Sequence, residues 1–572
     1  MAIPGKHLLS WLARQTRRVP RAFSGEVVTP DDPENAENMD CRSISRFNRN
    51  RKCAGLTLYK CVQWMLVMTG TALLLSIRAG AADRAGEMPP STIIINARVV
   101  DGTGAPSRWA SVRIEAGRIA AVGDLRTRPG ETVIDAKGQV LAPGFIDTHS
   151  HHDLGLFEKP DALPVVSQGV TTIIVGQDGA SNLPLKQFFR RLDATSSAVN
   201  VASYVGHNTI REAVMGNNFK RTASAREVTR MRTLVRAGMQ AGALGLSTGL
   251  EYDPGIYAAK GEVLTLAKEA ARAGGRYISH IRSEDQFIWD ALNEIVEIGR
   301  ATGMPVQVSH MKLAMTDWWG QADRYLAVMD RARAEGVDIT GDVYPYEHWQ
   351  STLTVMFPKR DFTNRQSAEF ALRHLAPAEG LLLSTFSPDP TLVGKTVAQI
   401  ATVRGTDPAT VLMQLIAESQ IPNAQEMVIG TSMRADYVAK LVAWPHSNIC
   451  SDGMLSDLHP RGSGSFPRVL RQYVREQHLL TIEQAVYRMT GAAAAHMGIS
   501  DRGVIRPGAH ADLVLFDPAI VSDRATIETP SAQSVGISSV WVNGEIVFAK
   551  GQSTGARPGR AIRRAALRSP PA

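Results

Sequence analysis

Residues 143–153 read PGFIDTHSHHD, a short apolar run that ends in His149, Ser150 and His151. Successive side chains on a strand point to opposite faces, so the two imidazoles on either side of Ser150 face the same way and can aim at one point. An H-x-H pair alone is a weak signal, because many such pairs are ordinary polar residues. Whether this pair binds a metal depends on which other side chains the fold places beside it.

Three further strand-like runs end in a residue that can bind a metal. His280 ends the run YISH, His310 ends VQVSH and Asp452 ends NICSD. Parallel barrels assemble their active sites at the carboxyl ends of the strands. If these runs belong to one barrel, four histidines and one aspartate meet at its mouth.

Strand-like and helical patterns alternate through this part of the chain. Eight strand candidates follow one another in the order IDTHSH, TTIIVG, VASYVGHN, GALGLSTG, RYISHIR, PVQVSHMK, VDITGDVYPY and SNICSDG. Helical patterns separate several of them, as at residues 225–241 and near 321–335. The alternation predicts an α/β fold, a (β/α)8 TIM-like barrel. A doubly wound open sheet is the alternative, and it is weakened because no G-x-G-x-x-G follows the first strand.

Short β-branched runs punctuated by glycine flank the predicted barrel on both sides. They occupy residues 91–143 and 501–556 and predict a small β-sandwich domain built from both chain ends. The barrel itself is expected over residues 144–500, with an insertion at about 350–427 where the unit spacing breaks after strand seven. Residues 557–572 carry five arginines and no acid, and we expect a solvated basic tail without an assigned role.

Four imidazoles and a carboxylate suit one or two Zn²⁺ ions, because neutral histidine nitrogens and carboxylate oxygens are ligands that zinc accepts. Zinc makes hydroxide available near neutral pH and can polarise a carbonyl. A carboxylate must then take the proton of the water and hand it to the leaving group. Asp452 is the candidate for this proton shuttle.

Residues 1–82 form a leader with its own composition. The apolar stretch at 61–77, CVQWMLVMTGTALLLSI, follows basic residues and precedes Ala79-Gly80-Ala81, which matches an export signal with an A-x-A cleavage site. We expect cleavage after about Ala81 and a periplasmic or secreted protein. A stretch of 17 residues is at the short limit for spanning a bilayer, so an uncleaved membrane anchor stays open.

The composition of the 572 residues is that of an ordinary globular protein, with 44% hydrophobic and 21% charged residues. The net charge is +8, but residues 1–82 hold 12 Lys and Arg against 6 Asp and Glu, so most of the excess lies in the leader. A nucleic-acid partner is therefore not supported. Beyond the leader Cys450 is the only cysteine, which excludes a disulfide scaffold.

The motifs that carry a family resemblance are PGFIDTHSHHD at 143–153, GLSTGLEY at 245–252, SHIRSE at 279–284, VSHMK at 308–312, SDG at 451–453, HPRGSGSFPRVL at 459–470, ADLVLFDP at 511–518 and VNGEIVF at 542–548. Single motifs recur across many hydrolases. Jointly and in this order they resemble the amidohydrolase superfamily, and within it the N-acyl-D-amino-acid deacylases, also called D-aminoacylases. The likeness covers about residues 92–564.

This resemblance implies a barrel beside a small β-sandwich, zinc, and hydrolysis of an N-acyl amide on an amino acid, often of D configuration. By motif, His149 and His151 would bind one metal position and His280 and His310 the other, with Asp452 as the acid/base. The residues implied to bind the substrate carboxylate are Lys312, Tyr344, Ser351 and Arg461. Two fixed cations and two hydroxyls suit an α-carboxylate, although Lys312 and Arg461 could also be structural.

The sequence departs from the family pattern after strand two. Where those deacylases carry a metal-bridging Cys in an N-C-G turn, this chain has Gln177-Asp178-Gly179. A carboxylate must then bridge the metals, or the site holds one metal. Glu251 at the end of strand four is slightly favoured over Asp178, and either could instead hydrogen-bond a histidine.

Two other histidines belong to the same strand ends. His207 is a possible carbonyl-polarising group or a polar residue without a catalytic role, and His152 is expected to be structural.

The sequence thus predicts an exported zinc amidohydrolase that acts on a small-molecule N-acyl-amino acid. The alternatives are a cyclic-amide hydrolase of the hydantoinase or dihydroorotase type, and an inactive metal-binding surface protein. A hydantoinase usually needs a bridging Lys on strand four, where Glu251 stands. Oligomeric state is not predicted.

Overall fold

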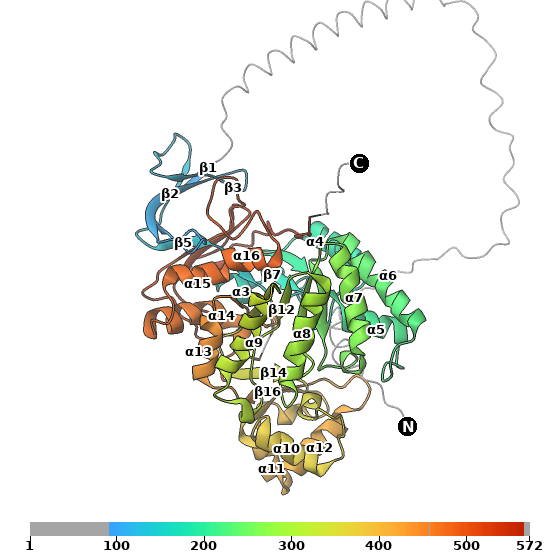
Figure 1. Cartoon of the computed structure of the whole chain (residues 1–572). Coiled ribbons are helices and arrows are strands. Elements are labelled where there is room, and N and C mark those ends of the chain that lie inside the picture. The colour runs from blue at the N-terminus through green and yellow to red at the C-terminus, as the bar shows by residue number, and fades with distance from the viewer. Residues whose placement is uncertain (1–90, 457, 566–572) are drawn as a thin grey trace, which may run out of the picture. The chain divides into compact units, whose positions relative to one another are not determined.

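The computed structural model describes residues 91–456 and 458–565 (Figure 1). The predicted leader, its export signal and its cleavage site lie outside these residues. Among the helices of the described part, none is both long and apolar enough to cross a membrane.

Parallel strands form two hydrogen-bonded arcs that together make the barrel. The first arc has the order β6-β7-β8 and the second β9-β10-β11-β12-β13-β17. Only Tyr204 separates β8 from β9, so the two arcs continue one another through a single interrupted strand. The strand bounds are β6 Phe145–Asp147, β7 Val170–Val175, β8 Asn200–Ser203, β9 Val205–Gly206, β10 Gly245–Gly249, β11 Arg276–His280, β12 Val306–Val308, β13 Ile339–Val343 and β17 Ser447–Ile449.

Beyond their ends, the first and last strands are joined by backbone hydrogen bonds. The amide of Asp452 donates to the carbonyl of His149 at 2.8 Å, and the amide of His151 donates to the carbonyl of Gly453 at 2.9 Å. The side chain of Asp147 also accepts the amide of Ser451 at 2.9 Å. We call these contacts the seam; they close the (β/α)8 ring that the strand pattern predicts.

Helices between the strands cover the outside of the ring (Figure 1). These helices are α4 Leu185–Thr195, α5 His207–Met215, α6 Ala225–Ala241, α7 Lys260–Arg272, α8 Ile288–Thr302, α9 Ala322–Ala334 and α13 Ala435–Ala443. The residues at the two ends of α6 explain where this helix begins and ends. Ser224 and Glu227 form a capping box at its start, and Gly242 with φ of 106° ends it in the left-handed conformation.

A separate layer is inserted between β13 and β17. It contains the antiparallel sheet β14-β16-β15 and three helices that lie together in Figure 1. The bounds are β14 His348–Ser351, α10 Arg365–His374, β15 Leu381–Phe386, α11 Val397–Arg404, α12 Pro408–Ser419 and β16 Glu426–Thr431. This segment follows the seventh strand position, where the sequence predicts an insertion.

Both ends of the described chain build one nine-stranded sheet. Its strands are β1 Ser91–Val99, β2 Arg108–Glu115, β3 Arg118–Gly123, β4 Thr132–Asp135, β5 Val140–Pro143, β18 Leu513–Phe516, β19 Ile537–Val542, β20 Glu545–Ala549 and β21 Gln552–Ser553. Antiparallel pairing of β5 with β18 joins the two halves. Val112, Leu141 and Trp541 belong to the separate apolar core of this sheet.

In residues 557–565, the described part of the basic tail, the side chains of Arg557, Arg560 and Arg563 are exposed, while backbone groups form hydrogen bonds with the barrel. The carbonyl of Arg560 accepts the amide of Val201 at 3.0 Å, and the amide of Ile562 donates to the carbonyl of Val201 at 2.8 Å. Arg557 also pairs with Asp161 at 3.0 Å. Backbone hydrogen bonds therefore hold residues 557–565 along the start of the β8 segment. Such bonds cannot be predicted from composition.

Candidate active site

Each predicted metal-binding side chain lies at or just beyond the carboxyl end of a barrel strand. His149 and His151 follow β6, Asp178 follows β7, His280 ends β11, His310 follows β12 and Asp452 follows β17. Three of these residues have left-handed backbone angles: φ is 52° at Asp178, 31° at His310 and 50° at Asp452. Such angles are costly for side chains other than glycine and cluster at functional sites. Here they turn three side chains toward one place.

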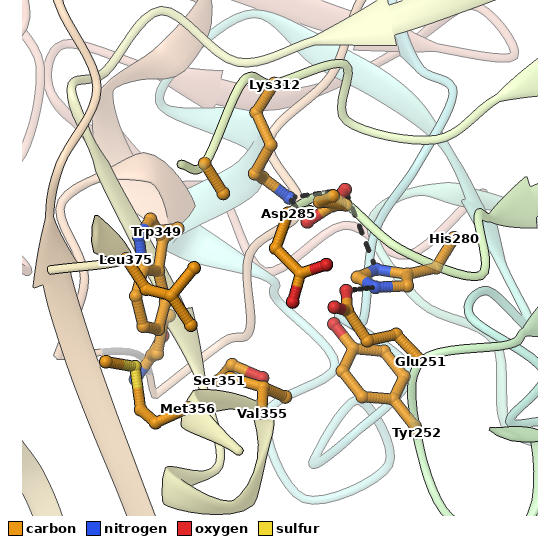
Figure 2. Close-up of a pocket in the computed structure, with 13 residues that line it drawn as sticks. Glu251, Tyr252, His280, Asp285, Lys312, Trp349, Ser351, Val355, Met356 and Leu375 are labelled. Atoms are coloured by element: carbon orange, nitrogen blue, oxygen red, sulfur yellow. Dashed lines mark hydrogen bonds and ion pairs between the residues drawn. The ribbon is translucent and has the colours of Figure 1, made fainter. Parts of the chain in front are cut away.

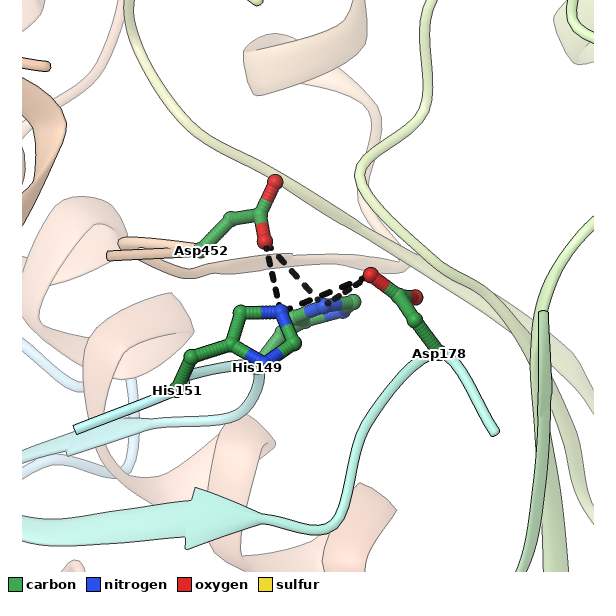
Figure 3. A group of neighbouring side chains, drawn as sticks. All are labelled: His149, His151, Asp178 and Asp452. Carbon is green, nitrogen blue, oxygen red and sulfur yellow. Dashed lines mark ion pairs between the residues drawn. The ribbon is translucent and has the colours of Figure 1, made fainter. Parts of the chain in front are cut away.

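Four side chains form the first cluster, which Figure 3 shows as two imidazoles facing two carboxylates. His149 Nε2 lies 3.4 Å from Asp178 Oδ2 and 3.3 Å from Asp452 Oδ1. His151 Nε2 lies 3.5 Å from Asp178 Oδ2 and 3.2 Å from Asp452 Oδ1. All four contacts connect a nitrogen of one strand end to an oxygen of another.

These separations fit a metal better than direct hydrogen bonds. Ligand atoms about 2.0–2.2 Å from a tetrahedral zinc stand about 3.3–3.5 Å from one another. The four distances of 3.2–3.5 Å agree with that spacing. In addition, His149 Nε2 is buried and has no hydrogen-bond partner among the described residues. A buried nitrogen without a partner is costly unless something else satisfies it.

A second cluster contains Asp178, His280 and His310. His310 Nε2 lies 3.5 Å from Asp178 Oδ1 and 2.9 Å from His280 Nδ1. The two oxygens of Asp178 therefore face different histidines, Oδ2 facing His149 and His151 and Oδ1 facing His310. This geometry favours Asp178 over Glu251 as the carboxylate shared by two metal positions, in contrast to the slight preference for Glu251 from sequence.

Carboxylates stand behind the histidines, on the side away from Asp178. Glu251 contacts His280 Nε2 at 2.8 Å, Glu284 contacts His310 Nδ1 at 3.0 Å, and Asp342 lies 3.6 Å from His149 Nδ1. Hydrogen-bonded carboxylates such as Glu251 and Glu284 fix the ring and its tautomer in metal sites, whereas His149 Nδ1 has no hydrogen-bond partner among the described residues. Burial lowers the pKa of His280 to about 3, so this imidazole is neutral, the form that binds metals.

Asp452 is the acid/base candidate and forms an ion pair with Arg461. Burial alone would raise the pKa of Asp452, but Arg461 and His149 outweigh it and hold this pKa well below its ordinary value. The carboxylate is therefore ionised and ready to accept a proton.

The residues implied to bind a substrate carboxylate converge beside this site. Lys312 Nζ contacts the two oxygens of Glu284 at 3.0 and 2.9 Å, and Glu284 raises the pKa of Lys312 against the effect of burial. The ring of Tyr344 lies 5.9 Å from Lys312 Nζ and 4.9 Å from Arg461 Cζ. Tyr344 Oη is buried without a hydrogen-bond partner in the described part. Ser351 lines the adjoining pockets.

Two adjoining pockets open next to the clusters and share Tyr252, Gln350 and Ser351. One reaches His151, Asp178, Asp452 and Arg461. The other is shown in Figure 2 and reaches Glu251, His280 and Lys312. A substrate with two arms can thus extend on both sides of Asp178.

His207 is not brought into either pocket. Its Nε2 contacts Glu262 at 2.9 Å, and Arg211 also pairs with Glu262. The predicted carbonyl-polarising role therefore has no geometric basis. His152 is fully buried with its Nδ1 3.8 Å from Asp147, and burial lowers its pKa to about 3.

Comparison with protein families gives a match to the model named Amidohydrolase family over residues 132–548. The chain belongs to the amidohydrolase family. It falls among the D-aminoacylase members. N-acyl-D-glutamate deacylase of Alcaligenes xylosoxydans xylosoxydans is 37% identical over 490 residues, 82% of this chain and 95% of that protein. D-aminoacylase of the same organism is 35% identical over 503 residues, 84% of this chain and 98% of that protein.

Solved amidohydrolase structures agree with this placement. N-acyl-D-glutamate deacylase from Bordetella bronchiseptica, complexed with zinc and a phosphonate that mimics the tetrahedral intermediate, is 38% identical with a TM-score of 0.75, and the match covers 83% of this chain and 100% of that chain. L-hydantoinase from Arthrobacter aurescens is 15% identical with a TM-score of 0.51, which shows a shared fold alone.

Several residues of this amidohydrolase site were not assigned from sequence. Glu284 lies inside the quoted motif SHIRSE and Asp342 inside VDITGDVYPY, but nothing in the sequence links either carboxylate to a histidine on a neighbouring strand. Asp285 and Tyr252 line the pocket of Figure 2 and follow barrel strands as well. The sequence shows only that these residues lie near the ends of strands. This position does not distinguish a metal ligand from a residue that hydrogen-bonds to a ligand.

Proposed function

We propose that this amidohydrolase cleaves the amide bond of N-acyl-D-amino acids and releases a carboxylate and a free amino acid. The observation that carries the proposal is the position of Asp178, whose Oδ2 faces His149 and His151 while its Oδ1 faces His310. Zinc fits the spacing of the donors in the first cluster, and it fits the imidazole and carboxylate chemistry of both clusters. The relatives named above are deacylases of this class, and one of them binds zinc.

The residues that would hold zinc are His149, His151, Asp178, His280 and His310, with Asp452 at the edge of the first cluster. When bound, the metal supplies Lewis-acid chemistry and acidifies water. Asp452 is ionised and faces the two histidines of β6, so it accepts the proton of the attacking water. It then delivers this proton to the amide nitrogen as the C–N bond breaks.

The free carboxylate of the substrate has a binding place next to Asp452. Lys312 and Arg461 both lie near the Tyr344 ring, and the Tyr344 hydroxyl has no hydrogen-bond partner among the described residues. Charge-assisted hydrogen bonds from these groups would hold the carboxylate and fix the amide over Asp178. Ser351 adds a hydroxyl from the inserted layer.

A panel of acetylated D- and L-amino acids tests the function directly. Purified protein should release acetate from the D series, lose this activity after chelation and regain it with zinc. Release from the L series alone would contradict the proposed configuration. Opening of a hydantoin without cleavage of N-acyl-amino acids would instead favour a cyclic-amide hydrolase.

The export of the protein also remains a proposal, supported by the apolar stretch at 61–77 and the following Ala79-Gly80-Ala81. N-terminal sequencing of the protein from its host should find a start after about Ala81. A protein found with its leader intact in the membrane fraction would establish the anchor alternative.

A further inference from the structure

The pocket of Figure 2 has two chemically different walls. His280 and Lys312 lie on the side of the metal clusters. The apolar wall on the opposite side is formed by Trp349, Val355, Met356 and Leu375. A ligand that fits here can place an apolar part against this wall and a polar group against the other.

Asp285 supplies that polar group. It follows β11 in the segment after Glu284, is 3% exposed, and Figure 2 shows its carboxylate directed into the pocket. One oxygen, Oδ1, accepts the hydroxyl of Ser283. The other, Oδ2, is buried and has no hydrogen-bond partner among the described residues. Buried carboxylates are normally paired, so an unpaired oxygen directed into a cavity indicates a partner that comes from outside.

No cation of the pocket compensates Asp285 in the described part of the chain. Lys312 lines the pocket but is held by both oxygens of Glu284 at 2.9 and 3.0 Å. The guanidinium of Arg360 donates to three backbone carbonyls, including that of Glu251, and does not line the pocket. Burial raises the pKa of Asp285; the Ser283 hydroxyl and the backbone amides of Phe287 and Gln286 oppose this effect, and the nearby Glu284 charge adds to it.

We infer that this pocket binds the side chain of the amino acid and that Asp285 selects N-acyl-D-amino acids with a cationic side chain. An aliphatic stem would lie along the apolar wall, and a terminal ammonium or guanidinium would reach Oδ2. The inference rests on the proposed function and narrows its substrate class. It also separates this chain from relatives named for D-glutamate and D-aspartate, because a second carboxylate next to Asp285 would be repelled.

Matched substrates isolate the contribution of the charge. N-acetyl-D-lysine and N-acetyl-D-norleucine share a straight four-carbon side chain and differ by the ammonium group. Wild-type kcat/KM should be at least roughly 10-fold higher for the lysine compound, and lowest for N-acetyl-D-glutamate. Asp285→Asn should lower the lysine value roughly 10–100-fold and leave the norleucine value within about threefold. Asp290→Asn, an exposed position on α8, is the control and should change neither.

The outcomes separate the inference from the function. Equal lysine-to-norleucine ratios in wild type and Asp285→Asn, or a wild-type preference for glutamate, would overturn the role of Asp285. Absence of hydrolysis for the whole panel in zinc-loaded wild type would overturn the proposed function instead. Inhibition of wild type by free D-lysine and free D-norleucine gives a test that needs no variant: equal inhibition by the two amino acids contradicts the inference, and stronger inhibition by D-lysine supports it.

Discussion

Replacing Asp178 by Asn removes one negative charge from the point where the two histidine pairs meet. Asn tolerates the left-handed φ of 52° at this position, so the backbone is expected to keep its course. A unit charge about 4 Å from another contributes roughly 4 kcal/mol at an effective dielectric constant of about 20, which is about a 10³-fold change in affinity. Asp178 lies 3.4–3.5 Å from His149, His151 and His310, so its charge acts on both zinc positions. Zinc affinity should therefore fall about 10³-fold at each position.

Glu251→Gln is the matched comparison, since the Glu251 carboxylate contacts His280 Nε2 at 2.8 Å and is not part of the first cluster. Loss of a supporting carboxylate typically lowers metal affinity about 10–100-fold, and here at one position only. Zinc content after dialysis and titration against a chromophoric chelator measure both variants. If Asp178→Asn still bound two zinc ions with wild-type affinity while Glu251→Gln lost zinc, Glu251 would be the ligand shared by the two metal positions. That result would refute the assignment of Asp178.

Four further substitutions or conditions test other parts of the structure. Asp452→Asn should keep zinc while kcat falls roughly 10²–10⁴-fold, and retained turnover would remove Asp452 from the mechanism. Asp342→Asn should lower zinc affinity about 10–100-fold without unfolding, because the Asp342 carboxylate accepts the amide of His310; unchanged metal titration would count against that support. Lys312→Met should raise KM more than it lowers kcat, and a larger kcat effect would place Lys312 outside carboxylate binding. In the small sheet, Arg113 holds the pKa of Glu131 at about 2, below its ordinary 4.5, so its stabilisation should be complete above about pH 4.5 and lost toward pH 2. Urea unfolding of wild type and Arg113→Met across this range measures the difference, and parallel pH profiles would refute it.

Much of the fold could be predicted from the sequence because its signals are local. The helix predicted at 225–241 is α6, and the eight strand candidates correspond to the eight strand positions of the ring. The relation between ring and site follows from topology, since parallel strands bring their carboxyl ends to one mouth. This is why His149, His280 and Asp452 could be assigned to one place although they are far apart in the chain.

What the sequence could not decide depends on turns and on contacts between segments. Asp178 and Glu251 are both carboxylates after strands, and only the turn geometry shows that Asp178 faces histidines of both clusters while Glu251 supports one ring. His207 follows a strand as the ligands do, yet it turns toward Glu262. Composition indicates the exposed arginines of residues 557–565 but not the hydrogen bonds to Val201, because these involve backbone groups.

The seam has a consequence for how the enzyme matures. The peptide groups of His149, His151 and Asp452 that close the ring belong to the same residues that form the first cluster, and three hundred residues of chain separate the two sides. A nascent or partly folded chain without its eighth strand therefore offers zinc an incomplete set of donors, and contacts this distant in sequence form late. Tight capture of the ion should thus coincide with the last step of folding, and a refolding experiment that follows zinc uptake would time the closing of the ring.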